Sequence, residues 1–252
     1  MKKKFYTLYK LFLINSFSNK IAIMFNIIFP VIYFAISNAA VLTSNYTISK
    51  NQLISGSAYY FSYIALTTIL NSVIMAMIEY RDYGYYKIVY MVSNSKYLIL
   101  ISQFLSQWTF LIAELFLFNL ITTLFFRSFA YIGYLLLTTT IAAFVLVFPL
   151  TMSLYFLLTV RLKLQTYSIV STLIIFGSFI FVTAETKNDL LNLLLLCTPI
   201  KYLMEGYEAI FQILFYKVDL STLINLLIVI VFYVLLGIIF IAKQNISTIF
   251  EK

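Results

Sequence analysis

The sequence has no histidine, one cysteine (Cys197) and no phosphate-binding loop. Without histidine the chain lacks the commonest metal ligand and proton shuttle, and it cannot build a Ser/His/Asp catalytic set. A single cysteine excludes an internal disulfide. The six glycines are scattered, and none begins a Gly-x-x-x-x-Gly-Lys run, so ATP cannot bind by that route. We therefore expect no catalytic centre, metal site or cofactor in this chain.

Charge is also scarce. Of the 252 residues, 63% are hydrophobic and only 10% are charged, whereas a soluble domain carries about 25% charged residues. Such a chain needs lipid as its main solvent, and in lipid the backbone must form helices or a closed barrel. The apolar runs are long and do not alternate, which favours helices over a barrel. The chain has a net charge of +8, and its basic residues flank the apolar runs. They do not form one basic face, which argues against nucleic acid as a partner.

Six apolar segments approach the length of about 20 residues that a membrane-spanning helix needs. We predict one domain over residues 1–252, with Pro30 and Pro149 kinking the first and fourth spans. The predicted spans run from about Ile21 to Ala39, Ser57 to Ile78, Tyr97 to Phe126, Tyr131 to Val160, Thr166 to Thr183 and Leu220 to Ala242.

Two further segments have helical patterns that do not suit a span. At the N-terminus, apolar residues from Phe5 to Leu13 fall on one helical face beside Lys2, Lys3, Lys4 and Lys10, which predicts an uncleaved helix at the membrane interface. Between Glu185 and Asp219, the stretches Leu190 to Leu196 and Ile200 to Tyr216 are separated by Pro199. They predict two short helices that enter the membrane from one side.

The positions of lysine and arginine set the orientation. With both termini in the cytoplasm, 12 of the 17 basic residues lie on the cytoplasmic side and the other 5 lie outside. The loop from Glu79 to Lys96 is then cytoplasmic, and the loop from Glu185 to Asp219 is external.

Glu114 is the ionisable residue that lies well inside a predicted span. Such a residue is costly in lipid and usually faces the interior of a helical bundle or a wet cavity. It can line a translocation path or pair across a subunit interface. Alternatively, it can fix helix packing through hydrogen bonds to Asn119, Gln107 or a threonine, and the sequence leaves both interpretations open.

A charged island, Glu79-Tyr80-Arg81-Asp82-Tyr83-Gly84-Tyr85-Tyr86-Lys87, separates the second and third predicted spans. It is longer than a turn and has the periodicity of a small amphipathic helix. Its tyrosines suit anchoring at the lipid interface, and they equally suit a groove on a partner protein.

The chain resembles, over nearly its whole length, the permease subunit of type-2 ATP-binding-cassette exporters. The N-terminal interfacial helix is one shared feature. The charged island resembles the coupling helix of that family, although Ser93-Asn94-Ser95 stands where the family usually has proline. The segment from Thr198 to Tyr207 is similar to the family's Pro-x-x-Tyr-x-x-Glu-Gly stretch in an external re-entrant hairpin. The matching residues are Glu79, Arg81, Asp82, Tyr83, Gly84, Tyr86, Lys87 and Tyr90 in the coupling helix, and Pro199, Tyr202, Glu205 and Gly206 in the hairpin.

The resemblance implies a definite assembly. Two permeases, identical or related, form a unit of 12 spans in the cell membrane, and two separate ATPase subunits that hold ATP and magnesium dock on the coupling helices. Abundant Ile, Asn, Lys, Tyr and Phe are typical of a low-GC Gram-positive bacterium. Small permeases of such bacteria often resemble exporters of cytolytic or antimicrobial peptides, so an amphipathic or hydrophobic cargo is expected.

Other functions remain open at this point. Lipid or drug export would use the same architecture. An ion-coupled carrier would need buried charges or broken helices at the membrane centre, for which Glu114 and Pro149 are the candidates. A membrane enzyme would need a polar cluster at one interface, and the sequence contains none that we recognise.

Overall fold

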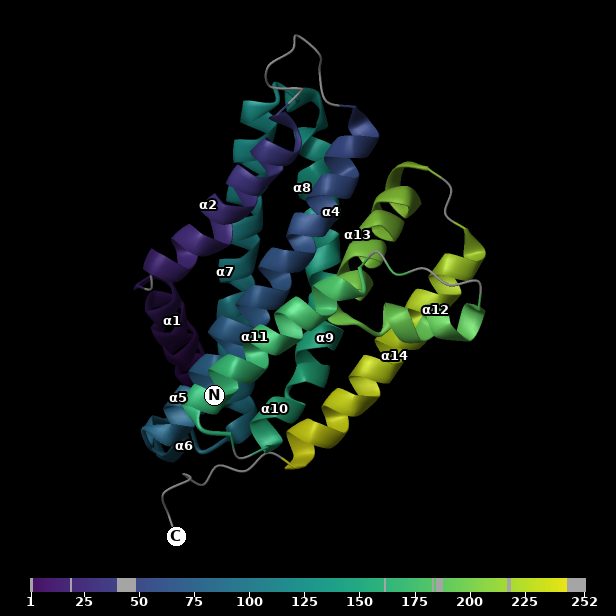
Figure 1. Cartoon of the computed structure of the whole chain (residues 1–252). Coiled ribbons are helices and arrows are strands. Elements are labelled where there is room, and N and C mark those ends of the chain that lie inside the picture. Colours follow the sequence, from purple (N-terminus) through teal and green to yellow (C-terminus); the bar gives the residue numbers. More distant parts are fainter. Residues whose placement is uncertain are drawn as a thin grey trace.

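Helices account for almost all of the residues that the structure describes, and no strand occurs among them (Figure 1). This computed structural model describes residues 2–18, 20–39, 49–160, 162–182, 184, 188–216 and 219–243. The predicted all-α class is confirmed. Six residues that entered the predictions lie outside the described residues, namely Arg161, Thr183, Glu185, Lys187, Lys217 and Lys252.

Four helical stretches are long and apolar enough to cross a membrane: Lys50–Asp82, Tyr97–Phe125, Phe129–Thr159 and Leu220–Lys243. They correspond to the second, third, fourth and sixth predicted spans. Helices Lys3–Ser18 and Ile23–Ser37 meet at 55° and count as a fifth span if the bent pair is taken together. The predicted fifth span appears as an apolar helix, Leu164–Ile180, that is shorter than a span requires. The chain is therefore a multi-helix protein suited to a membrane, with four to five spans by length and composition.

The stretch Lys50–Asp82 consists of three consecutive segments, α4 (Lys50–Thr67), the π-helical turn η1 (Thr68–Ile74) and α5 (Met75–Asp82). A capping box starts α4, because the Ser49 side chain accepts a hydrogen bond from the Gln52 backbone and the Gln52 side chain accepts one from the Ser49 backbone. Residues of all three segments are buried, so this stretch forms the centre of the fold.

The stretch Phe129–Thr159 is divided into η2 (Phe129–Tyr131), α8 (Ile132–Val145), α9 (Val147–Leu154) and α10 (Phe156–Thr159). The break between α8 and α9 falls at Leu146, close to Pro149. Proline has no N–H, so the carbonyl of Val145 loses its helical partner. Pro30, by contrast, lies inside the uninterrupted α2 (Lys20–Ser37).

Helix α1 (Lys2–Ser18) packs across α7 (Lys96–Phe125). Leu8 and Phe12 of the predicted apolar face are buried, and the ring of Phe12 stacks on Tyr80 with centroids 5.7 Å apart. The Gln107 side-chain amide donates a hydrogen bond of 2.6 Å to Ser16 Oγ. The apolar face of α1 therefore contacts protein rather than lipid.

The last third of the chain contains α11 (Leu164–Ile180), α12 (Asp189–Leu196), α13 (Pro199–Phe215) and α14 (Leu220–Lys243). The two short helices predicted around Pro199 are thus present as helices. Helix α13 packs against α4 and α8, whereas α14 lies along α9 at the outside of the fold (Figure 1). The start of α1, helix α6 (Tyr85–Ser93) and the end of α14 lie at the same end of the molecule (Figure 1).

Candidate functional site

The charged island folds as the end of α5, a tight turn and the short helix α6. Gly84 precedes α6 with φ of 72°, a left-handed conformation that glycine adopts without strain. Asn94 ends α6 with φ of 59°, and asparagine is one of the few other residues that tolerate this region. The Ser95 side chain then caps α7 by accepting a hydrogen bond from Leu98 N. Asn94 and Ser95 therefore make the turn for which the resembling family uses proline.

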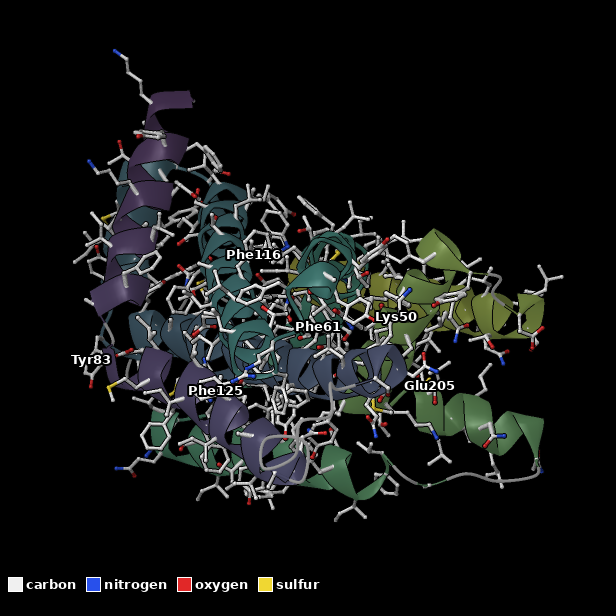
Figure 2. The ribbon with its side chains drawn as sticks, turned by 90° about the horizontal axis from the view of Figure 1, so that it is seen from above. Lys50, Phe61, Tyr83, Phe116, Phe125 and Glu205 are labelled. Atoms are coloured by element: carbon white, nitrogen blue, oxygen red, sulfur yellow. The ribbon has the colours of Figure 1, made fainter. Side chains whose placement is uncertain are left out.

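We call the end of α5, the turn at Gly84 and α6 together the elbow. Its outer side, which we call the α6 surface, is formed by Tyr83, Lys87, Ile88 and Met91. Tyr83 is 74% exposed, Ile88 is 60% exposed and Met91 is 69% exposed. Figure 2 shows the Tyr83 side chain pointing away from the helical bundle. Residues 87, 88 and 91 share one face of α6, so this face exposes two large apolar side chains and one lysine, and Tyr83 is exposed in the turn just before the helix.

Tyr86 and Tyr90 lie on the opposite side of α6. Tyr86 is only 3% exposed, and Tyr90 is half-buried against the core. Burial raises the pKa of the Tyr86 phenol above its usual value, which keeps this side chain neutral. These two tyrosines support α6 from within, whereas Ile88 and Met91 of the same helix are exposed.

Arg81 and Asp82 also face inward. The Arg81 side chain forms an ion pair of 3.1 Å with Asp82. Its two terminal nitrogens donate hydrogen bonds to the carbonyls of Val160 and Leu162. Arg81 therefore joins the end of α5 to the connection between α10 and α11. Of the predicted docking residues, only Glu79, Tyr83 and Lys87 carry exposed side chains.

The segment that resembles the re-entrant hairpin is held by close packing. Pro199 opens α13 at its first turn, where proline costs no hydrogen bond. Tyr202 is buried, and its hydroxyl donates a bond of 3.4 Å to the Leu146 carbonyl. A Cβ atom on Gly206 would lie 2.7 Å from Leu146 Cδ1, so any larger residue would displace the Leu146 side chain. Tyr202 and Gly206, one helical turn apart, both fix α13 at the break between α8 and α9.

Charged and polar groups brace the same helix. The Lys201 ammonium donates a hydrogen bond to the Ala184 carbonyl and lies 3.7 Å from the Glu205 carboxylate. Burial, together with the neighbouring Glu205, raises the pKa of the Glu208 carboxyl above its usual value. The Tyr207 hydroxyl lies 3.2 Å from Thr139 Oγ1. Among the predicted hairpin residues, Tyr202 and Gly206 thus pack α13 against the neighbouring helices.

Glu114 is 1% exposed and lies where three helices cross. One carboxylate oxygen accepts a hydrogen bond of 3.1 Å from Asn26 on α2, and the other accepts one of 2.9 Å from Thr68 at the start of η1. The partners named from the sequence, Asn119 and Gln107, bond elsewhere, whereas the predicted threonine is present. The two hydrogen bonds tie Glu114 to neighbouring helices, so its observed contacts are those of a packing residue.

The π-helical turn η1 is tied to two other helices by its carbonyls. The Tyr167 hydroxyl on α11 donates a hydrogen bond of 2.6 Å to the Leu70 carbonyl, which also accepts from Met75 N five residues ahead. Gln103 on α7 donates a bond of 3.4 Å to the Ser72 carbonyl. π-helical turns are rare and often occur at functional sites. Together with the bond between Thr68 and Glu114, these bonds fix η1 to α7 and α11.

Lys50, at the first turn of α4, is surrounded by aromatic rings. Its ammonium lies 5.1 Å from the ring centroid of Tyr134, 5.4 Å from that of Phe211 and 4.7 Å from that of Tyr216. These distances are within the range of cation–π attraction. The contact joins α4 to the start of α8 and the end of α13.

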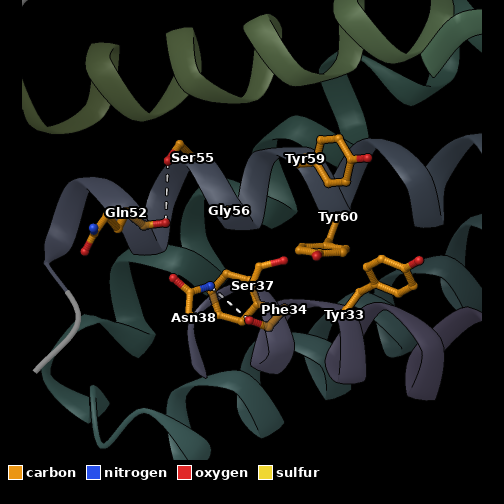
Figure 3. A pocket seen from close by; sticks show the side chains of 9 residues that line it. All are labelled: Tyr33, Phe34, Ser37, Asn38, Gln52, Ser55, Gly56, Tyr59 and Tyr60. Atoms are coloured by element: carbon orange, nitrogen blue, oxygen red, sulfur yellow. Dashed lines mark hydrogen bonds between the residues drawn. The ribbon is translucent and has the colours of Figure 1, made fainter. Parts of the chain in front are cut away.

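A cleft of about 470 Å³ lies between α2 and α4, and we call it the tyrosine cleft (Figure 3). Its lining consists of Tyr33, Phe34, Ser37, Asn38, Gln52, Ser55, Gly56, Tyr59 and Tyr60. The lining contains no charged side chain. A Cβ atom on Gly56 would lie 2.3 Å from Phe34 Cε2, so the ring of Phe34 occupies its place only because residue 56 is glycine.

No family model, curated protein or solved structure matches the chain. The functional argument therefore rests on the geometry above. The tyrosine cleft could not be found from the sequence, because α4 supplies only half of its lining. Its other half comes from α2, and no local pattern indicates that the two ends lie side by side.

Proposed function

We propose that this chain is the membrane permease subunit of an ATP-driven exporter of the type-2 ATP-binding-cassette class. Two copies, or this chain and a related one, would form the transport unit in the cell membrane of a Gram-positive bacterium. Two separate ATPase subunits would supply ATP and magnesium from the cytoplasm. In this proposal α1 lies at the cytoplasmic interface, α2 and α11 complete a set of six spans, and α12 and α13 form an external re-entrant hairpin.

The observation that carries the proposal is the α6 surface. Tyr83, Ile88 and Met91 expose large apolar side chains beside Lys87, in a segment that also exposes the charged Glu79. Charged neighbours favour an aqueous boundary over the lipid core, and exposed apolar groups at such a boundary favour a protein partner. The elbow is held to the connection after α10 by Arg81, so a push on α6 would be carried into the spans.

The proposed cargo is an amphipathic or hydrophobic molecule, and cytolytic or antimicrobial peptides are our first choice. The uncharged, aromatic lining of the tyrosine cleft suits such a cargo better than an ionic solute. Lipids and drugs share this chemistry and are the alternative substrates of the same machine.

The experiment is to isolate the chain from its native membrane and identify the proteins that accompany it. We expect an ATPase to co-purify with the wild-type chain. Replacement of Tyr83, Ile88 and Met91 together by alanine should abolish its capture because the apolar contact is removed. A matched control replaces three exposed apolar residues of α14 by alanine, namely Ile224, Ile228 and Leu235, and should retain the ATPase. Equal capture by both triple variants, or no ATPase with the wild type, contradicts the proposal.

An ion-coupled carrier is the second candidate, and the buried Glu114 favours it. Such a carrier would transport without an ATPase, and Glu114→Gln would stop transport while the fold persists. In the exporter, Glu114→Gln should lower thermal stability slightly, because one of the two oxygens that accept hydrogen bonds from Asn26 and Thr68 is replaced by an amide nitrogen. Reconstituted transport measured with and without ATP separates these two mechanisms.

A further inference from the structure

The tyrosine cleft changes in character along its length. The end of α2 and the start of α4 lie at the same edge of the molecule, because α2 ends at residues 37–38 and α4 begins at residues 49–50. The polar lining residues Ser37, Asn38, Gln52 and Ser55 lie near this edge, and Tyr33, Tyr59 and Tyr60 lie farther along the helices (Figure 3). The cleft is therefore polar at the helix ends and aromatic toward the middle of the spans.

The polar end offers both kinds of hydrogen-bonding group. The Asn38 amide donates to the Phe34 carbonyl, at 2.9 Å, which leaves its oxygen as an acceptor. The Gln52 side-chain oxygen is used by Ser49 in the capping box, which leaves its amide nitrogen as a donor. A ligand head with donors and acceptors of its own, such as an amide or a sugar, can satisfy both.

Charge is absent from the cleft for a structural reason. Lys50 lies two residues before Gln52, but its ammonium is directed to the rings of Tyr134, Phe211 and Tyr216. No aspartate or glutamate lines the cleft to pair with a cationic ligand. An ionic head placed there would lose its hydration without gaining a counter-charge.

From this gradient we infer that the tyrosine cleft binds an amphiphile with an uncharged hydrogen-bonding head, its head at the Asn38 and Gln52 end and its apolar part against the three tyrosines. The inference rests on the proposed function, because it assigns the cargo-contacting site of the exporter. It also narrows the cargo, since the positive charges of a peptide would lie outside the cleft and only a neutral segment would enter it. A glycolipid and a neutral peptide segment share this chemistry.

The test uses the full-length chain in lipid nanodiscs and dodecyl probes that carry a photoreactive diazirine on the alkyl chain. Two probes have neutral heads, one a maltoside and one a glycyl-glycine amide, and two have charged heads, trimethylammonium and sulfate. After illumination, the labelled residues are mapped by mass spectrometry. We expect saturable labelling of the tyrosine cleft by a neutral probe, with half-saturation at about tenfold lower concentration than for either charged probe. Stronger labelling by the maltoside indicates a glycolipid source, and stronger labelling by the amide indicates a peptide source.

Two variants check the position of the site. Gly56→Ala should weaken labelling about tenfold, because the added methyl group forces the Phe34 ring out of its place beside the cleft. Gly177→Ala, at a helix position with open space around it, is the matched control and should label like the wild type. Tyr33→Ala removes a half-exposed lining ring with little effect on packing, so it reports on the cleft even if Gly56→Ala fails to fold.

The inference is overturned if a charged probe labels the cleft as well as the neutral ones, or if Tyr33→Ala labels like the wild type. The assay contains neither ATPase nor nucleotide. Failure of probe binding therefore leaves the co-purification result intact, and failure of co-purification leaves the binding site intact.

Discussion

The stretches Lys50–Asp82 and Leu220–Lys243 are both long enough to cross a membrane, yet they occupy opposite places in the fold. In Lys50–Asp82, 72% of an apolar segment of 18 residues is buried within the protein. In Leu220–Lys243, which is the more apolar of the two, only 22% of such a segment is buried. A soluble protein would bury its most apolar helix. Here the most apolar helix faces outward and the one with more polar groups forms the centre, as expected when lipid is the solvent.

The difference also separates where function can reside. Lys50–Asp82 carries the capping box, the lining of the tyrosine cleft, the π-helical turn and Arg81. Leu220–Lys243 contributes a narrow buried stripe of Leu226, Val229, Tyr233 and Gly237 and otherwise presents exposed aliphatic side chains. Substitutions in the first stretch should therefore cost more than similar ones in the second.

The largest effect is expected at Arg81, at the end of the buried stretch. Arg81→Met should lower the free energy of unfolding by about 3 kcal/mol, because Asp82 loses its partner and two carbonyls lose their donor. Unfolding of the detergent-solubilised chain measures the change. The control is Lys87→Met on the exposed side of α6, which should leave stability unchanged. Equal losses in both variants would show that Arg81 does not hold the elbow.

A substitution at Gly237 should have an intermediate effect, because this residue is buried although most of α14 is exposed. A Cβ atom on Gly237 would lie 2.4 Å from Met152 Cβ and 2.8 Å from the Met152 carbonyl carbon. Gly237→Ala should therefore destabilise the protein by about 2 kcal/mol through overpacking, although α14 is mostly exposed. Gly177→Ala, which meets nothing within 4 Å, should be neutral in the same melting experiment. A neutral Gly237→Ala would mean that α14 does not approach α9 this closely.

The smallest effect compares one chemical change at two sites. Ile69→Val removes a methylene from a side chain that is buried in η1 and should cost about 1 kcal/mol. Ile228→Val removes the same group from the exposed side of α14 and should cost almost nothing, because lipid fills the space. Thermal unfolding of both variants side by side decides the matter. Equal costs would remove the distinction between the central and the outer helix.

The sequence predicted the helices and helix breaks that depend on neighbouring residues, such as apolar runs and prolines. Length and hydropathy predicted six spans, four of which are present as helices long enough to cross a membrane, and Pro199 correctly separated α12 from α13. The break near Pro149 was also foreseen, although it falls at Leu146, whereas Pro30 lies within an unbroken α2. The six-span layout exceeds the four to five spans that length and composition support, because α11 is too short and α1 and α2 form a bent pair.

Features made by contacts between distant segments were not foreseen. Tyrosine content drew attention to Tyr86, but the turn at Gly84 rotates that residue inward and leaves Ile88 and Met91 outside. The contact of Lys50 with aromatic rings joins α4 to α8 and to the end of α13. Tyr202 and Gly206 were picked out as a motif, yet their common neighbour Leu146 lies some 60 positions earlier in the sequence. No single stretch of the sequence contains both partners of these contacts.

The π-helical turn sets the rotation of the residues that follow it in the central stretch. A π turn holds one residue more than the α-helical turn that would replace it, so deletion of a single residue between 68 and 74 would convert it to a regular helix. Such a deletion would leave the residues after the turn facing the same way, whereas a change from π to α without a deletion would rotate everything after it by about 100° about the helix axis. Arg81 would then turn away from the carbonyls of Val160 and Leu162, and α6 would leave its place. The hydrogen-bond pattern of one turn in the middle of a span thus sets the direction in which α6 faces.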